Sequence, residues 1–333
     1  MILPEQFVVS LRADALKKAK NKKRVCLVYN CQKDSILSHV IWKKGILSKI
    51  AERNNHLIEL NVQKRFRHEK LSFTLTGINE ILAFKGFCNY HDNLIFSGIE
   101  KSGVDFHKYK NQILVCVRGM YYERRKKEIN IDKFYGTIKE NILPYQEQID
   151  FLKDSIYQHE LGIKDIGFYT SELNKEYIKP MGRFYFKTFE LPIVPVISSS
   201  MFHVDSYETM ERNYTYDDDW EDIPLNSILF SLFPYEGKSY FIIGFHANYL
   251  QNMPLIHGLS KMTQTELLQF VSDILIERVE SWACSPSFYE KHLKEIEQII
   301  LDYFDEDPND FSLKSQKRIN IFEKWVKGSR TVI

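Results

Sequence analysis

The stretch GFCNYHD, residues 86–92, places Cys88 and His91 three residues apart among turn-forming side chains. A second short-spaced pair, Cys26 and Cys31, lies well before it in the chain, next to the predicted turn at residues 30–35. A structural zinc ion takes four such ligands at tetrahedral corners, and two short-spaced pairs on turns can supply them without straining the backbone. We therefore predict that Cys26, Cys31, Cys88 and His91 bind one zinc ion. The alternative is that Cys26 is a buried apolar residue of a strand and that the other spacings arise by chance.

Composition limits the classes of protein that this chain can belong to. Its 333 residues are 44% hydrophobic, which is enough for a substantial core and, by size, for about two domains. Lys and Arg number 45 against 44 Asp and Glu, so the net charge of +1 provides no chain-wide field that would gather nucleic acid. Five cysteines, an odd number, do not describe a disulfide framework.

The hydropathy pattern predicts where the protein is found. No segment approaches the apolar length of a membrane-spanning helix, and charged residues occur too early in the chain for the apolar core of a secretion signal. We therefore expect a soluble, cytoplasmic protein with no membrane partner.

Hydrophobic periodicity predicts an α+β fold. Before the middle of the chain it predicts a strand at residues 24–29 and helices at 5–22, 36–51, 109–127 and 146–159. Residues 181–250 alternate aromatic and β-branched side chains with polar ones, which predicts an antiparallel sheet with a hairpin loop at PYEGK, 234–238. The last predicted helices span residues 263–282, 287–303 and 312–326. We divide the chain into a zinc-binding domain at 1–135, a helical connector at 136–180 and an α+β domain at 181–333.

A third motif, SHVI at residues 38–41, stands between the two ligand pairs. With the two pairs it resembles HNH nucleases of the ββα-metal, treble-clef type, in which a zinc knuckle frames a histidine followed by two apolar residues. The chain also resembles uncharacterised bacterial proteins that carry a Ser-His motif and a Gly-Phe-Cys-x2-His-Asp motif. The resemblance covers residues 24–100. In the nucleases the second knuckle is Cys-x2-Cys followed by His, whereas here it is Cys-x2-His followed by Asp92.

The resemblance implies a site that hydrolyses phosphodiesters. His39 would be the general base, and Asp92 would hold a divalent cation, Mg²⁺ or Mn²⁺. Imidazole titrates near physiological pH, and a hard cation on carboxylate oxygen neutralises charge that develops in the transition state. Ser38 stands where the nucleases usually carry a metal-binding Asp or His, and Asn79 is the nearest candidate for the asparagine that orients the base. From the residues alone, Asp92 could equally cap a helix, and His39 could be a buried, hydrogen-bonded histidine.

Two functions follow as hypotheses. In the first, the chain is an HNH-type nuclease that acts in defence against foreign DNA, and basic residues contact the phosphates of the substrate, so that binding weakens with salt. These residues are Lys43, Lys44, Lys64, Arg65 and Arg67, which could also form a solvated loop. In the second, the chain is a non-catalytic, zinc-stabilised sensor or adaptor that binds a protein or a small ligand.

Other polar and sulfur-bearing residues are predicted to be structural. Cys116 and Cys284 occur in apolar patterns and are expected in the core. His203, His246 and His257 lie in or beside the predicted sheet without a cysteine at ligand spacing. The acidic segment at residues 217–222 is expected to be a solvated loop.

Overall fold

A computed structural model describes residues 5–60, 72–139, 146–204, 224–305 and 319–325. The strands are β1 (Leu37–His39), β2 (His56–Leu60), β3 (Phe73–Gly77), β4 (Ala83–Lys85), β5 (Phe184–Leu191), β6 (Val196–His203), β7 (Ser227–Tyr235), β8 (Lys238–His246) and β9 (Trp282–Cys284). The α-helices are α1 (Glu5–Asn21), α2 (Ser48–Ile50), α3 (Asn89–Phe96), α4 (Tyr109–Lys139), α5 (Gln146–Ile178), α7 (Met253–Leu259), α8 (Gln264–Glu277), α9 (Pro286–Phe288) and α10 (Glu297–Asp305). The predicted α+β class is confirmed. Within the part of the chain that is described, no helix combines the length and apolar character needed to cross a bilayer.

A seven-stranded sheet organises most of the molecule, in the order β3-β2-β9-β6-β7-β8-β5, and every neighbouring pair is antiparallel. The predicted sheet at residues 181–250 is therefore confirmed as its β5 to β8 part. The hairpin between β7 and β8 turns at Glu236 and Gly237, whose φ angles of 47° and 83° are typical of a two-residue hairpin turn. Strands β2 and β3 join the same sheet through β9, where Ile58 pairs with Cys284. The domain boundaries predicted at residues 135 and 180 stay predictions.

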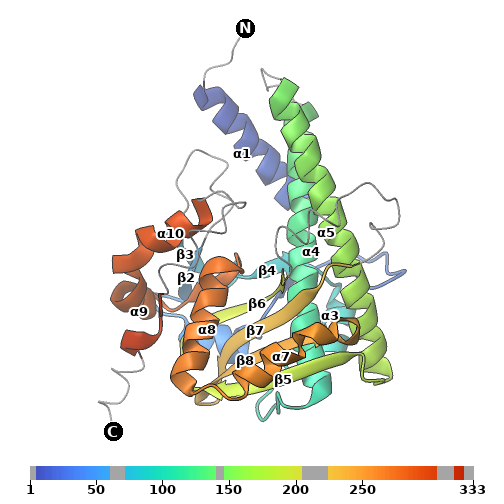
Figure 1. Cartoon of the computed structure of the whole chain (residues 1–333). Helices are drawn as coiled ribbons and strands as arrows, with labels where there is room; N and C mark the ends of the chain where they lie inside the picture. The colour runs from blue at the N-terminus through green and yellow to red at the C-terminus, as the bar shows by residue number, and fades with distance from the viewer. Residues whose placement is uncertain (1–4, 61–71, 140–145, 205–223, 306–318, 326–333) are drawn as a thin grey trace.

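Helices cover both faces of the sheet (Figure 1). Alternate side chains of β7 divide between two cores: Leu229 and Phe233 pack with residues of α4 and α5, whereas Phe230 and Leu232 pack with residues of α8. This alternation follows from the two-residue period of a strand. The long helices α4 and α5 lie side by side, and α1 lies against α4. The sheet and the α4–α5 pair thus form the base on which the N-terminal segments are placed.

The N-terminal segments differ from their predicted structure. Residues 37–39, predicted as part of a helix, form β1 and pair with β4. Ser38 is buried there and Leu37 is exposed, so this short stretch has the two-residue period of a strand. Residues 24–29, predicted as a strand, make only an isolated bridge from Val25 to Asp34. The described elements therefore run β1, β4, α3 around the ligand pairs, with the β2–β3 hairpin inserted between β1 and β4.

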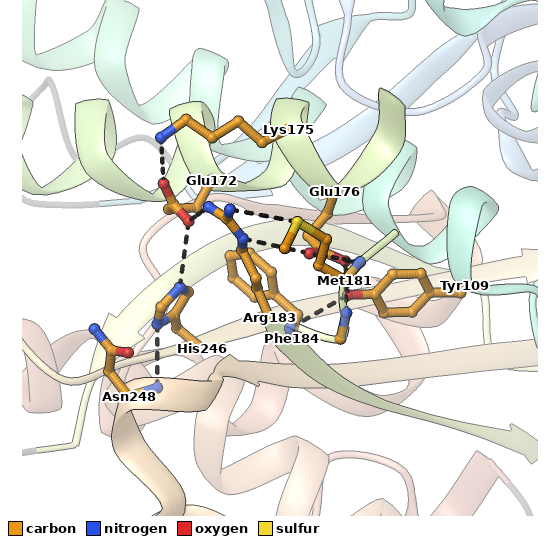
Figure 2. Close-up of polar contacts among 10 residues, drawn as sticks. Tyr109, Glu172, Lys175, Glu176, Met181, Arg183, Phe184, His246 and Asn248 are labelled. Carbon is orange, nitrogen blue, oxygen red and sulfur yellow. Dashed lines mark hydrogen bonds and ion pairs between the residues drawn. The ribbon is translucent and has the colours of Figure 1, made fainter. Parts of the chain in front are cut away.

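A carboxylate network fixes the end of α5 to the sheet (Figure 2). Glu176 is fully buried and accepts hydrogen bonds from the Tyr109 hydroxyl at 2.9 Å and from the backbone N–H of Met181 at 3.0 Å. Burial alone would raise the pKa of Glu176, but these donors lower it below its usual value. One turn earlier, Glu172 pairs with Arg183, the residue before β5. The network holds α5, and through it α4, in a fixed position on the sheet.

Close packing between α4 and β6 depends on Gly119. A Cβ atom added there would lie 2.8 Å from the carbonyl oxygen of Ser199, which is backbone and cannot rotate away. We expect Gly119→Ala to lower the free energy of unfolding by about 1–3 kcal/mol, as overpacking usually does. Gly167→Ala on α5 is the matched control, because nothing lies within 4 Å of its Cβ position. It should raise the free energy of unfolding by about 0.5–1 kcal/mol through helix propensity. Urea unfolding followed by circular dichroism measures both, and equal stability of the two variants would contradict this packing.

Candidate metal centre

The first ligand pair lies on a tight turn between α1 and β1. The backbone N–H of Cys31 donates to the carbonyl of Val28 at 3.0 Å, and Asn30 takes a positive φ of 60° to close the turn. The N–H of Cys26 donates to the carbonyl of Lys33 at 2.9 Å across its base. These bonds direct the two thiols to the same side of the turn.

The second ligand pair lies at the start of α3. Cys88 is the N-cap residue, in extended conformation, and His91 is in the first turn of the helix. The two ligand segments are also joined by backbone hydrogen bonds, from Leu27 N–H to the Gly86 carbonyl at 2.9 Å and from Ile36 N–H to the Phe87 carbonyl at 2.7 Å. These backbone hydrogen bonds therefore hold the segment before α3 against the chain segment that carries Cys26 and Cys31.

The four predicted ligands come together. Their ligand atoms all lie within 4.8 Å of one another, and among the described residues this is the one group of three or more such side chains that can hold a metal ion. Nδ1 of His91 is 3.4 Å from the sulfur of Cys26 and 3.4 Å from that of Cys88, and the sulfurs of Cys31 and Cys88 are 3.9 Å apart. All four cysteine and histidine side chains are buried or half-buried, and the cysteines form no disulfide. This Cys3His cluster can bind a metal ion such as zinc.

The thiols of the cluster differ in acidity. Hydrogen bonding from the backbone N–H of His91 lowers the pKa of Cys88, because a helix N-terminus stabilises the thiolate. Burial raises the pKa of Cys26. A metal ion takes thiolates as ligands, so its charge would compensate the cost of deprotonating the buried thiol.

His39 lies at the end of β1 with its ring oriented by the backbone. Its Nε2 is 2.8 Å from the carbonyl oxygen of Ile78, which can only accept, so Nε2 carries the proton and Nδ1 has the free lone pair. Burial lowers the pKa of His39, and the positive charges of Lys43 and Arg118 lower it further. The half-buried imidazole is therefore neutral at pH 7.

Asp92 lies in the first turn of α3 and faces Arg118 of α4. The guanidinium Nη2 is 3.3 and 3.5 Å from the two carboxylate oxygens of Asp92, and Nη1 is 2.5 Å from Glu100. Arg118 is only 2% exposed and stacks on the ring of Phe96 at 4.4 Å. The charges of Asp92 and Arg118 act on the pKa of His39 in opposite directions, since the carboxylate raises it and the guanidinium lowers it. The side chain of Asp92 accepts hydrogen bonds from Arg118. The alternative, that Asp92 caps the helix, is not what forms, because the N-cap residue of α3 is Cys88.

Sequence reasoning missed three members of this site, namely Ile78, Glu100 and Arg118. Arg118 had a signal in the sequence, because it is a charged residue directly after the apolar run at residues 113–117 of the predicted helix 109–127. Ile78 contacts His39 through its backbone carbonyl, and the residue type gives no indication of such a contact. The carbonyl belongs to the residue before Asn79, whose own side chain accepts a hydrogen bond from Lys43. Ser38 points away into the interior, and its hydroxyl has no hydrogen-bond partner in the described structure.

The predicted phosphate-binding residues are described only in part. Lys43 is half-buried, and Lys44 is exposed on the short π-helix η1 (Lys43–Leu47) that follows β1. Lys64, Arg65 and Arg67 lie outside the described residues, as does the acidic segment 217–222.

The residues predicted to be structural differ in burial: Cys116, Cys284 and His246 are buried, His203 is half-buried beside Ser227, and His257 is exposed on α7. Cys116 and Cys284 are buried in the two cores, and burial raises the pKa of Cys116 to about 12. His246 is 5% exposed at the end of β8, and its Nδ1 accepts the backbone N–H of Asn248 (Figure 2).

Comparison of the chain with protein-family models, with curated proteins and with solved structures gave no match.

Proposed function

We propose that Cys26, Cys31, Cys88 and His91 hold one structural zinc ion. Zinc takes thiolate and imidazole ligands, and a set of four protein ligands leaves no open position for catalysis. Two sulfurs at tetrahedral corners around zinc, each about 2.3 Å from it, would be about 3.8 Å apart. The 3.9 Å between the sulfurs of Cys31 and Cys88 is close to this value. The ion would join two chain segments that are distant in sequence.

On this scaffold we propose a metal-dependent phosphodiesterase of the HNH type that acts on nucleic acid. The observation that supports the proposal is that β1, which ends at His39, pairs with β4, and that β4 is followed by α3 with Asp92, in the order of a ββα unit. The charge of Asp92 also acts on His39. His39 is neutral, and its free Nδ1 can accept the proton of an attacking water. The carbonyl of Ile78 keeps the ring in that tautomer while the proton is transferred.

Asp92 is the group that would hold the divalent cation. A carboxylate is a ligand of choice for Mg²⁺ or Mn²⁺, and such ions are often held by one or two carboxylates together with the phosphate of the substrate. The distances of 3.3 and 3.5 Å from Arg118 are long for a charge-assisted hydrogen bond, so the carboxylate is only loosely held. When bound, the cation would neutralise charge on the phosphate. Exposed Lys44 would hold the substrate backbone.

The test is an assay of the zinc-loaded chain on single-stranded DNA, double-stranded DNA and RNA, with Mg²⁺ or Mn²⁺ added. We expect cleavage that requires the cation and that Asp92→Asn abolishes. Asp150→Asn on the exposed side of α5 is the control, and it should cleave as the unaltered chain does. If every substrate stays intact with both cations, the proposed activity is wrong.

A second candidate function is favoured by one observation, the buried guanidinium beside Asp92. Arg118 already supplies a positive charge there, which would make a divalent cation unnecessary. In that case the chain is a non-catalytic, zinc-stabilised sensor or adaptor. This function predicts that Asp92→Asn leaves Mn²⁺ binding unchanged, whereas the phosphodiesterase requires that the substitution weaken it.

A further inference from the structure

Arg118 is shared between two carboxylates in an enclosed position. It is 2% exposed, and the ring of Phe96 covers one face of the guanidinium at 4.4 Å. Asp92, at the start of α3, and Glu100, after its end, both lie against the guanidinium nitrogens. With the guanidinium charged and both carboxylates ionised, the trio carries one net negative charge.

The two carboxylates are held unequally. Glu100 is 2.5 Å from Nη1, whereas the nearest oxygen of Asp92 is 3.3 Å from Nη2. A charge-assisted N–H···O bond normally measures about 2.7–2.9 Å, so Glu100 makes the close pair and Asp92 the weak one. Both acids are partly exposed, with 26% of the Glu100 side chain and 15% of the Asp92 side chain accessible.

The unequal pairing of Glu100 and Asp92 with Arg118 affects whether Asp92 can bind the proposed cation. As long as Glu100 makes the close pair with the guanidinium, Asp92 is held only by the long contacts of 3.3 and 3.5 Å and can exchange them for a cation. If Glu100 lost its charge, Asp92 would be the remaining counter-ion of a buried arginine, and a bidentate pair would form between them. The carboxylate of Asp92 would then be unavailable.

We propose that Glu100 is a positioning residue, which occupies Arg118 and thereby keeps the carboxylate of Asp92 available to a divalent cation. The inference rests on the proposed function, because it concerns the same cation. Glu100 itself contacts neither the cation nor the substrate. A partner that orients a metal ligand typically changes metal affinity by about 10–100-fold when it is removed.

The experiment measures Mn²⁺ binding to the zinc-loaded full chain by electron paramagnetic resonance of free Mn²⁺, without substrate. We expect Glu100→Gln to weaken Mn²⁺ binding by about tenfold or more, nearly as much as Asp92→Asn. The double variant Glu100→Gln/Arg118→Met should recover most of the lost affinity, because it removes the arginine that would otherwise capture Asp92. A purely structural role for Glu100 would give no such recovery, since the second substitution would add damage.

The matched control is Glu128→Gln, which removes the carboxylate partner of another buried arginine of α4, Arg125. It should leave Mn²⁺ affinity unchanged. If Glu100→Gln binds Mn²⁺ as tightly as the unaltered chain, or if the double variant stays as weak as the single one, the role of Glu100 is wrong and the cation at Asp92 stands. If the unaltered chain binds no more tightly than Asp92→Asn, the cation at Asp92 is wrong and the role of Glu100 falls with it.

Discussion

Replacing Cys88 with serine is expected to release the zinc ion and to unfold the N-terminal segments around it. Cys88 is 3% exposed, lies between Cys31 and His91, and begins α3, so its sulfur is both a ligand and part of the packing. Structural zinc contributes about 10–16 kcal/mol of apparent binding energy in small zinc-dependent folds. If the weakened site releases the ion, the stabilisation that is lost is comparable to the whole margin of an ordinary domain, about 5–15 kcal/mol.

The measurement is zinc content by mass spectrometry, together with thermal unfolding before and after treatment with a chelator. Cys116→Ser is the control, because Cys116 is also a buried cysteine but lies outside the cluster, 3.9 Å from the hydroxyl of Ser231. It should keep its zinc and its sensitivity to the chelator. A Cys88→Ser protein with the zinc content and melting temperature of the unaltered chain would contradict the structural role.

Replacing His39 with glutamine is expected to lower the rate of phosphodiester cleavage by about 10²–10⁴-fold, the usual contribution of a general base. Glutamine can still donate an N–H to the carbonyl of Ile78, so the fold and the zinc content should not change. The loss should appear in kcat, because His39 acts on the water and not on substrate binding.

The pH dependence gives a second check on His39. A general base must be neutral, and burial lowers the pKa of His39 from its ordinary value of 6.5. Activity of the unaltered chain should therefore persist at pH 6.5 and fall only at lower pH, as His39 becomes protonated. His107→Gln is the control, because His107 is an exposed histidine paired with Glu190. Full activity of His39→Gln would rule out His39 as the base.

The sequence predicted those features that depend on local pattern or on residue type. The aromatic and β-branched runs at residues 183–189 and 240–245 indicated strands, and β5 and β8 form there. The spacing of Cys26, Cys31, Cys88 and His91 indicated a cluster, and their ligand atoms meet. In each case the signal is contained in a short stretch or in a rare residue type.

The features that the sequence did not predict depend on contacts between distant segments. Leu37 to His39 form a strand because β4 pairs with them. Three residues are too few to show a strand pattern within the helical hydrophobic pattern of residues 36–51. Strand β2 joins the C-terminal sheet through β9, which is likewise three residues long. The environment of Arg118 depends on its contacts with Asp92 and Phe96 of α3, which periodicity within one helix does not reveal.

X-ray absorption at the zinc edge of the purified chain tests the central claim most directly. The account predicts a shell of three sulfur atoms at about 2.3 Å and one nitrogen atom at about 2.0–2.1 Å. A chain that purifies without zinc, or zinc surrounded only by oxygen and nitrogen, would contradict it.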